Sequence, residues 1–173
     1  MRGFLAAKPG PYTRQAMLSS FSIKPLASDQ VLQAYPLITI FDPELIQAQW
    51  SSYAEDVLAK SRNGAGHGIL TVQNDEQYIY GLSAYWPKPD LRQGRVLEIE
   101  NFAVVDFTGN RGVARLLLNG LEDLGQRMAC SCVTISLLNP QMRKWLRQPR
   151  NPAIDVFRHA GFRGEQLRLR KCF

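Results

Sequence analysis

The chain has 173 residues, of which 45% are hydrophobic and 21% charged, as is typical of one globular domain that buries a sizeable core. No apolar run approaches the roughly 20 residues that a membrane-spanning helix needs, and the 3 cysteines without framework spacing argue against a secreted disulfide scaffold. We therefore expect a cytoplasmic protein without a membrane partner, in which residues 1–19 form a flexible N-terminal arm and residues 20–173 a single domain.

Positive charge is concentrated at the C-terminal end. The formal net charge is +6, and residues 141–173 alone contain 9 Lys and Arg against 2 Asp and Glu. Such an excess favours an anionic ligand or partner, for example the phosphates of CoA or an RNA. A solvated basic surface is an equally open interpretation.

The first predicted elements are a strand and an amphipathic helix. Residues 21–26 alternate in polarity, as a strand does. Asp42-Pro43-Glu44 predicts a helix start, because an N-cap residue is followed by proline and then by an acid. Apolar residues then recur at helical spacing as far as Leu58, and a Gly-rich flexible loop follows over residues 63–68.

Three further strands are predicted after that loop. Residues 67–72 and 78–86 form a hairpin-like pair with turn residues at Asn74-Asp75, and Pro87-Lys88-Pro89 is predicted to end the second strand. Residues 95–105 are rich in branched and aromatic side chains and form the next strand.

The remaining elements build a β-α-β unit and a C-terminal extension. The predictions are a Gly-rich turn over 108–112, a helix from Val113 to Leu124, a buried central strand over 128–138, a basic connection over 139–151, a helix over 152–160 stopped by Gly161, and a final strand over 166–173. This order of elements predicts a mixed-sheet α/β (α+β) fold.

The Gly-rich turn is a candidate anion site. Backbone N–H groups at the start of a helix have no partner within the helix, and they attract negative charge. Here the amides of Arg111 to Arg115 could face a pyrophosphate, since Gly112 has no side chain and Ala114 is small. The turn alone is also compatible with an ordinary helix start with a packing glycine.

Two segments carry a family resemblance. Residues 102–117 resemble the acetyl-CoA motif of the GNAT superfamily, Gln/Arg-x-x-Gly-x-Gly/Ala after a Leu-x-Val strand end. Gly112 and Ala114 match the last two fixed positions, whereas Gly109 departs from the expected Gln or Arg. Residues 153–162 are similar to the family's late helix.

The resemblance implies a GNAT-like fold over residues 20–173, with a mostly antiparallel sheet, a central β-α-β unit that binds acetyl-CoA, and flanking helices. It implies acetyl-CoA-dependent N-acetyltransferase activity. It also implies a set of cofactor-binding residues: Phe102, Val104, Gly109, Asn110, Arg111, Gly112, Val113, Ala114, Arg115 and Phe157.

Acetyl transfer to an amine requires a general base, because a free amine is mostly protonated at neutral pH. Glu98 and Glu100 are two residues apart on a predicted strand, so both side chains fall on one face. The resemblance places Glu98 where several family members carry their basic glutamate, and we therefore prefer Glu98 over Glu100. A pair of solvent-facing acids on a sheet edge is the alternative.

Phe157 stands where many family members have a tyrosine that protonates the CoA sulfur, and a phenylalanine cannot donate a proton. Either the thiolate leaves unassisted, or another group serves, or catalysis is weak. His159 is two residues further along a helix and faces away, whereas His67 lies in a Gly-rich loop that could reach a cleft. Tyr80, Tyr85 and Trp86 could line an acceptor pocket, although strand aromatics are more often core.

The acceptor itself stays open. A small-molecule or protein amine is our first interpretation. The basic segment 139–151, with Trp145, favours a toxin-like acetyltransferase that acts on aminoacyl-tRNA. Phe157 and Gly109 favour a non-catalytic module that binds CoA or nucleic acid. A homodimer is compatible with all three interpretations.

Overall fold

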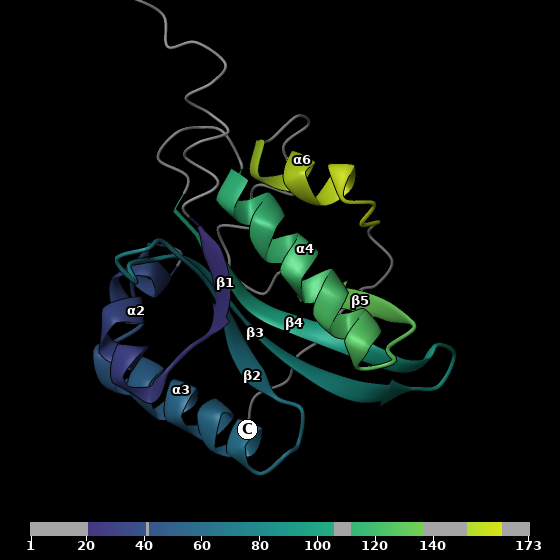
Figure 1. Ribbon diagram of the computed structural model, residues 1–173, viewed down its shortest axis with the longest axis horizontal. Coiled ribbons are helices and arrows are strands. Elements are labelled where there is room, and N and C mark those ends of the chain that lie inside the picture. Colours follow the sequence, from purple (N-terminus) through teal and green to yellow (C-terminus); the bar gives the residue numbers. More distant parts are fainter. Residues whose placement is uncertain (1–20, 41, 106–111, 137–151, 164–173) are drawn as a thin grey trace, which may run out of the picture.

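A five-stranded sheet with helices on both faces forms the framework of the protein (Figure 1). The computed structural model describes residues 21–40, 42–105, 112–136 and 152–163. Its elements, in chain order, are β1 (Ser22–Pro25), the 3-10 helix η1 (Ser28–Gln30), α2 (Val31–Thr39), α3 (Gln47–Arg62), β2 (Gly68–Gln73), β3 (Ile79–Asp90), β4 (Gly94–Val104), α4 (Gly112–Arg127), β5 (Cys132–Ile135) and α6 (Pro152–His159).

The strands lie in the order β1-β2-β3-β4-β5. The pairs β1–β2, β2–β3 and β3–β4 are antiparallel, and β5 is parallel to β4. A parallel neighbour requires a crossover connection, and α4 supplies it between β4 and β5. The predicted mixed, mostly antiparallel sheet with a β-α-β unit is therefore confirmed.

Each face of the sheet has its own hydrophobic core. Alternate residues of a strand point to opposite faces, so Ile69 packs with α2 and α3 while its neighbour Leu70 packs with α4 and α6. In Figure 1, α2 and α3 accordingly lie on one side of the sheet, and α4 and α6 lie on the other. The α4 helix approaches closely, because a Cβ on Gly120 would lie 2.5 Å from Cδ1 of Ile23.

The residues of helix α2 were not predicted to form a helix. Pro36 lies inside this helix and removes one backbone donor, which makes the segment a poor helix by propensity. Tertiary packing compensates, since Val31, Ala34, Leu37 and Ile38 are buried at helical spacing. The indole Nε1 of Trp50 on α3 also donates to Val31 O over 2.7 Å and joins the two helices.

The predicted start of the next helix at Asp42 is wrong. The backbone at Asp42 forms a turn in which Leu45 N donates to Asp42 O over 3.1 Å. Proline suits such a turn as well as a helix start. The helix α3 begins at Gln47, where the Gln49 side chain accepts a hydrogen bond from Ile46 N over 3.1 Å.

The predicted strand end at Pro87-Lys88-Pro89 is also wrong, because β3 continues through both prolines to Asp90. The strand β2 pairs with β3 only as far as Tyr85, so at Pro87 and Pro89 the one strand neighbour recorded for β3 is β4. A residue without an N–H is tolerated where one edge of the strand needs no hydrogen bond. The predicted turn at Asn74 is confirmed, since its Oδ1 accepts a hydrogen bond from Tyr78 N over 2.8 Å.

The predicted strand over 128–138 is shorter in the structure. It spans Cys132–Ile135 and is half-buried, while Met128 donates a backbone hydrogen bond to Leu124 O at the end of α4. Within the described residues β5 is the last strand of the sheet rather than a central one. The predicted helix over 152–160 is confirmed as α6, and Gly161 follows it with a φ of +85°.

The predicted N-terminal arm, the connection 139–151 and the final strand 166–173 lie outside the described residues. Among the helices that the structure does describe, none has the length and apolar character needed to cross a lipid bilayer.

Candidate active site

A β-bulge in β4 shapes the centre of the sheet. Ala84 of β3 pairs with Glu100 and Leu82 pairs with Ala103, so two residues of β4 lie opposite the single residue Ser83. One of the two, Asn101, has a φ of +53°. The Ser83 Oγ donates to the carbonyl of Glu100 over 3.0 Å and holds the bulge in place.

The bulge separates the side chains of β4 by face. Glu98 and Glu100 pair with Trp86 and Ala84, which pack into the core beneath α2 and α3. Directly paired residues share a face, so both carboxylates lie on the α3 side of the sheet. The next aromatic residue, Phe102, packs into the core beneath α4. The predicted placement of the two glutamates on one face is therefore confirmed.

The strands β4 and β5 diverge beyond Ile99. Their pairing ends at Ile99↔Ile135, followed by one hydrogen bond of 3.0 Å from Ser136 N to Ile99 O. On the other edge of β4, Val105 N donates to Tyr80 O over 2.8 Å. Since backbone groups alternate in direction along an antiparallel strand, the N–H of Val104 points to the edge that β5 has left.

The helix α4 begins beside this edge. Gly112 is its first residue, and the first N–H groups of a helix have no acceptor within it. The side chains of Val113 and Ala114 are buried in the core, so only their backbone groups could contact a ligand. Arg115 is exposed. A Cβ on Gly81 would lie 3.1 Å from both Val104 and Val113, which shows how closely the end of β4 and the start of α4 pack. The predicted contacts Gly109, Asn110 and Arg111 lie outside the described residues.

Glu98 is buried, with 3% of its surface exposed. Its Oε1 accepts a short hydrogen bond from Ser136 Oγ, and its Oε2 lies 2.5 Å from Nζ of Lys88. Within the described residues Oε2 accepts no other hydrogen bond, so the ion pair is what compensates its burial. Lys88 remains 43% exposed at the side chain. The carboxylate is thus fixed between β5 and β3 while its cationic partner reaches solvent.

Tyr53 of α3 lies beside Glu100 and the side chain of Asn101. Burial raises the pKa of the Tyr53 phenol to about 12; a polar contact with the Asn101 side chain opposes the shift, and the negative charge of Glu100 adds to it. The hydroxyl is buried and makes no hydrogen bond of normal geometry within the described residues. At neutral pH this phenol stays protonated.

His67 stacks on Trp86, the residue that pairs with Glu98. The ring centroids are 6.1 Å apart and the rings are inclined by 17°. Partial burial lowers the pKa of His67, and the nearby positive charge of Lys60 lowers it further. The loop that contains His67 therefore brings an imidazole to the face of the sheet that carries Glu98.

Phe157 of α6 is buried among aromatic rings. Its centroid lies 5.1 Å from that of Phe102 and 6.1 Å from that of Phe162, both in edge-to-face geometry. Such packing stabilises the contact between α6 and the end of β4. The side chain offers no polar atom, in agreement with the expectation that it cannot serve as an acid.

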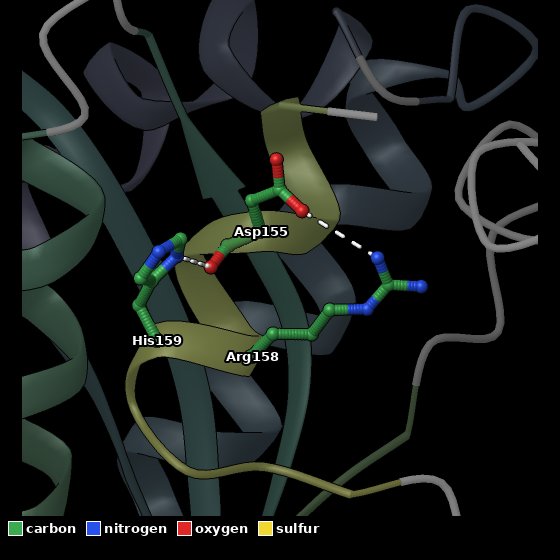
Figure 2. A network of polar contacts seen from close by, with 3 residues as sticks. All are labelled: Asp155, Arg158 and His159. Atoms are coloured by element: carbon green, nitrogen blue, oxygen red, sulfur yellow. Dashed lines mark hydrogen bonds and ion pairs between the residues drawn. The ribbon is translucent and has the colours of Figure 1, made fainter. Parts of the chain in front are cut away.

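His159 is exposed and engages its own helix, as Figure 2 shows. Its Nδ1 lies 2.5 Å from the carbonyl oxygen of Asp155, and Arg158 Nη1 lies 3.5 Å from the Asp155 carboxylate. Basic residues in the last turn of a helix interact favourably with its dipole. We therefore assign this group to the stability of α6.

Sequence reasoning missed three residues of the site: Lys88, Ser136 and Tyr53. Lys88 was predicted to lie at a strand end. In the longer β3 it lies two residues after Trp86, the residue that pairs with Glu98, and this spacing indicates a diagonal cross-strand ion pair. Ser136 and Tyr53 carry no comparable local signal, because tertiary packing brings them to β4. No group of three potential metal ligands occurs in the part of the chain that the structure describes.

Comparisons with known proteins agree with the fold. The model of the acetyltransferase (GNAT) family matches residues 33–162. Among curated proteins no sequence matches significantly. An aminoglycoside N-acetyltransferase in complex with CoA superimposes with a TM-score of 0.68 at 15% identity, covering 88% of this chain and 94% of that one.

Two further solved structures are similar. Glucosamine-6-phosphate N-acetyltransferase from Arabidopsis thaliana has a TM-score of 0.63 at 13% identity, with 88% of this chain and 98% of that chain covered. Ribosomal-protein-alanine N-acetyltransferase from Brucella melitensis biovar Abortus 2308 has a TM-score of 0.62 at 17% identity, with 88% and 99% covered. At these identities the likeness shows the fold.

Proposed function

Because the chain belongs to the acetyltransferase (GNAT) family, we propose that it is an acetyl-CoA-dependent N-acetyltransferase that transfers the acetyl group to an amine. The carrying observation is the buried carboxylate of Glu98, which lies on β4 near the point where β5 diverges. A base and an open strand edge on one strand are what amine acetylation requires.

The acyl donor would bind along the edge that β5 has left. The Val104 N–H at this edge and the N–H groups at the start of α4 would contact the pantetheine arm and the pyrophosphate of CoA. The fit is supported by the close packing of Gly81, Val104 and Val113, which keeps both sets of donors near one another. CoA supplies the activated thioester, and the Val104 N–H would donate to its carbonyl oxygen.

The amine acceptor would approach from the α3 side. Glu98 would remove a proton from the bound amine, directly or through one water molecule, and the free amine would then attack the acetyl carbon. A C–N bond forms, the nitrogen gives up its second proton to solvent, the C–S bond breaks, and the electron pair stays on the CoA sulfur. Glu100 is the second candidate base, since it lies on the same face.

Departure of the CoA thiolate would proceed without a proton from Phe157. A thiolate is a good leaving group near neutral pH, because an ordinary thiol has a pKa of about 8.5. No tyrosine is therefore required at this position, and the aromatic cluster with Phe102 and Phe162 gives Phe157 a packing role instead.

An amine acceptor is supported by the neighbours, since the three named above are N-acetyltransferases by title. They act on an amino sugar phosphate, an aminoglycoside and a protein alanine, so they do not agree on one acceptor. The segment 139–151, on which an aminoacyl-tRNA acceptor would depend, lies outside the described residues. The described site favours neither that acceptor nor a non-catalytic module.

The test is thiol release from acetyl-CoA in the presence of amines of three classes: an amino sugar, an aminoglycoside and a peptide with a free N-terminus. We expect release that depends on the amine and an acetylated product by mass spectrometry. An Arg158→Gln variant on the exposed face of α6 should retain the same rate. Thermal protection by CoA without turnover on any amine would contradict the proposal.

A further inference from the structure

We infer that the Tyr53 hydroxyl binds the amino group of the acceptor, with Glu100 beside it as the negatively charged partner. This inference rests on the proposed N-acetyltransferase function and specifies its acceptor site. The acceptor would then be a primary amine that enters as an ammonium ion, because a carboxylate and a hydroxyl oxygen both accept hydrogen bonds from N–H groups.

The oxygen of Tyr53 is buried, yet it makes no hydrogen bond of normal geometry within the described residues. Buried polar groups are nearly always paired, and an unpaired one costs stability that a bound ligand could recover. A phenylalanine would fill the same space without this cost.

The Tyr53 hydroxyl lies among polar groups of β4. Its electrostatic neighbours are Glu100 and the side chain of Asn101, both on β4 at the bulge. Glu98 lies two residues earlier on the same face, so its Cα is roughly 6–7 Å from that of Glu100. A ligand nitrogen held by Tyr53 and Glu100 would therefore lie on the face of the sheet that holds the proposed base.

With a pKa of about 12, the Tyr53 phenol neither donates nor removes a proton near neutral pH. It is suited to hold a substrate rather than to act as an acid or a base. An alkyl ammonium ion has three N–H groups, of which Tyr53 and Glu100 would engage two and leave the third for Glu98.

Other tyrosines of the described chain provide matched controls. The Tyr35 hydroxyl donates to Leu45 O over 2.9 Å, so it already has a structural partner. Tyr78 is 56% exposed and needs none. Replacing each of the three by phenylalanine removes the same oxygen atom from three different environments.

The experiment measures steady-state acetylation of the best amine from the panel by wild type, Tyr53→Phe, Tyr35→Phe and Tyr78→Phe. For Tyr53→Phe we expect the KM for the amine to rise about tenfold or more, as for the loss of one hydrogen bond to a charged group. The KM for acetyl-CoA should stay within twofold and kcat should fall less than the amine KM rises. The two control variants should leave the amine KM unchanged.

Thermal unfolding separates binding from structure. Tyr53→Phe should keep or increase Tm, because the Tyr53 hydroxyl makes no hydrogen bond of normal geometry, whereas Tyr35→Phe should lower it. An unchanged amine KM in Tyr53→Phe, or a Tm drop as large as that of Tyr35→Phe, would overturn the inference while leaving the proposed function intact. Absence of transfer by wild type to every amine would overturn the function and, with it, this inference.

Discussion

The Nζ of Lys88 on β3 lies 2.5 Å from the Oε2 of Glu98 on β4. The ammonium group is partly in solvent and the carboxylate is buried. Removing the lysine would leave the carboxylate buried with Ser136 as its one recorded hydrogen-bond partner.

We expect Lys88→Met to lower the free energy of unfolding by about 1–3 kcal/mol, between the values typical of exposed and fully buried ion pairs. Chemical denaturation measures this difference, and Lys24→Met on the exposed side of β1 is the control. A double variant Lys88→Met/Glu98→Gln should be more stable than Lys88→Met alone, because its buried group is neutral. Equal stabilities of the single and double variants would contradict this account.

The aromatic contact between Phe157 and Phe102 should dominate the attachment of α6. Phe157→Ala removes a buried ring and leaves a cavity, so we expect a loss of about 3–5 kcal/mol in unfolding free energy. Leu91→Ala, at a fully exposed position in the β3–β4 turn, should change it by less than about 0.5 kcal/mol. A Phe157→Ala protein as stable as Leu91→Ala would show that the ring does not pack as described.

Alkaline pH should destabilise the wild type through Tyr53. The folded-state pKa of about 12 lies above the ordinary value of 10.0, so the folded protein holds this proton more tightly than the unfolded chain does. The contribution is complete below about pH 10 and is lost as the pH rises toward 12. Between these limits the wild type should lose about 2 kcal/mol more than Tyr53→Phe. Parallel pH profiles of unfolding free energy would argue against the buried phenol.

His67 should titrate below an ordinary histidine. Partial burial and the positive charge of Lys60 both disfavour the imidazolium form. In NMR titrations we expect Lys60→Gln to raise the pKa of His67 toward its usual range, with Lys24→Gln as a control. An unchanged pKa of His67 in Lys60→Gln would show that Lys60 on α3 does not act on the loop that contains His67.

Periodicity and turn residues predicted much of the fold. The apolar spacing of Val113, Leu117 and Leu121 predicted the buried face of α4, and the branched and aromatic residues of 95–105 predicted β4. Proline misled the prediction in two places, at Pro43 and Pro87. In each case tertiary context determined whether a missing N–H was tolerated, and a local pattern cannot show which edge of a strand is unpaired.

The site was predicted less completely than the fold. Glu98 and Glu100 were placed on one face because the period of a strand follows from the sequence. Their partners come from elements 10 to 47 residues away in the chain, such as Lys88, Ser136 and Tyr53. Spacing cannot find such contacts, and the phosphate contacts predicted at Gly109 to Arg111 stay a prediction.

The central claim is that Glu98 acts as the base of an amine acetylation. The most direct measurement is kcat of Glu98→Gln with the best amine of the panel, together with the shift in Tm that CoA produces. We predict a fall in kcat of about 10²–10⁴-fold with an unchanged CoA-induced shift, and full activity in the control His159→Ala. A Glu98→Gln enzyme that acetylates the amine at the wild-type rate would contradict the account.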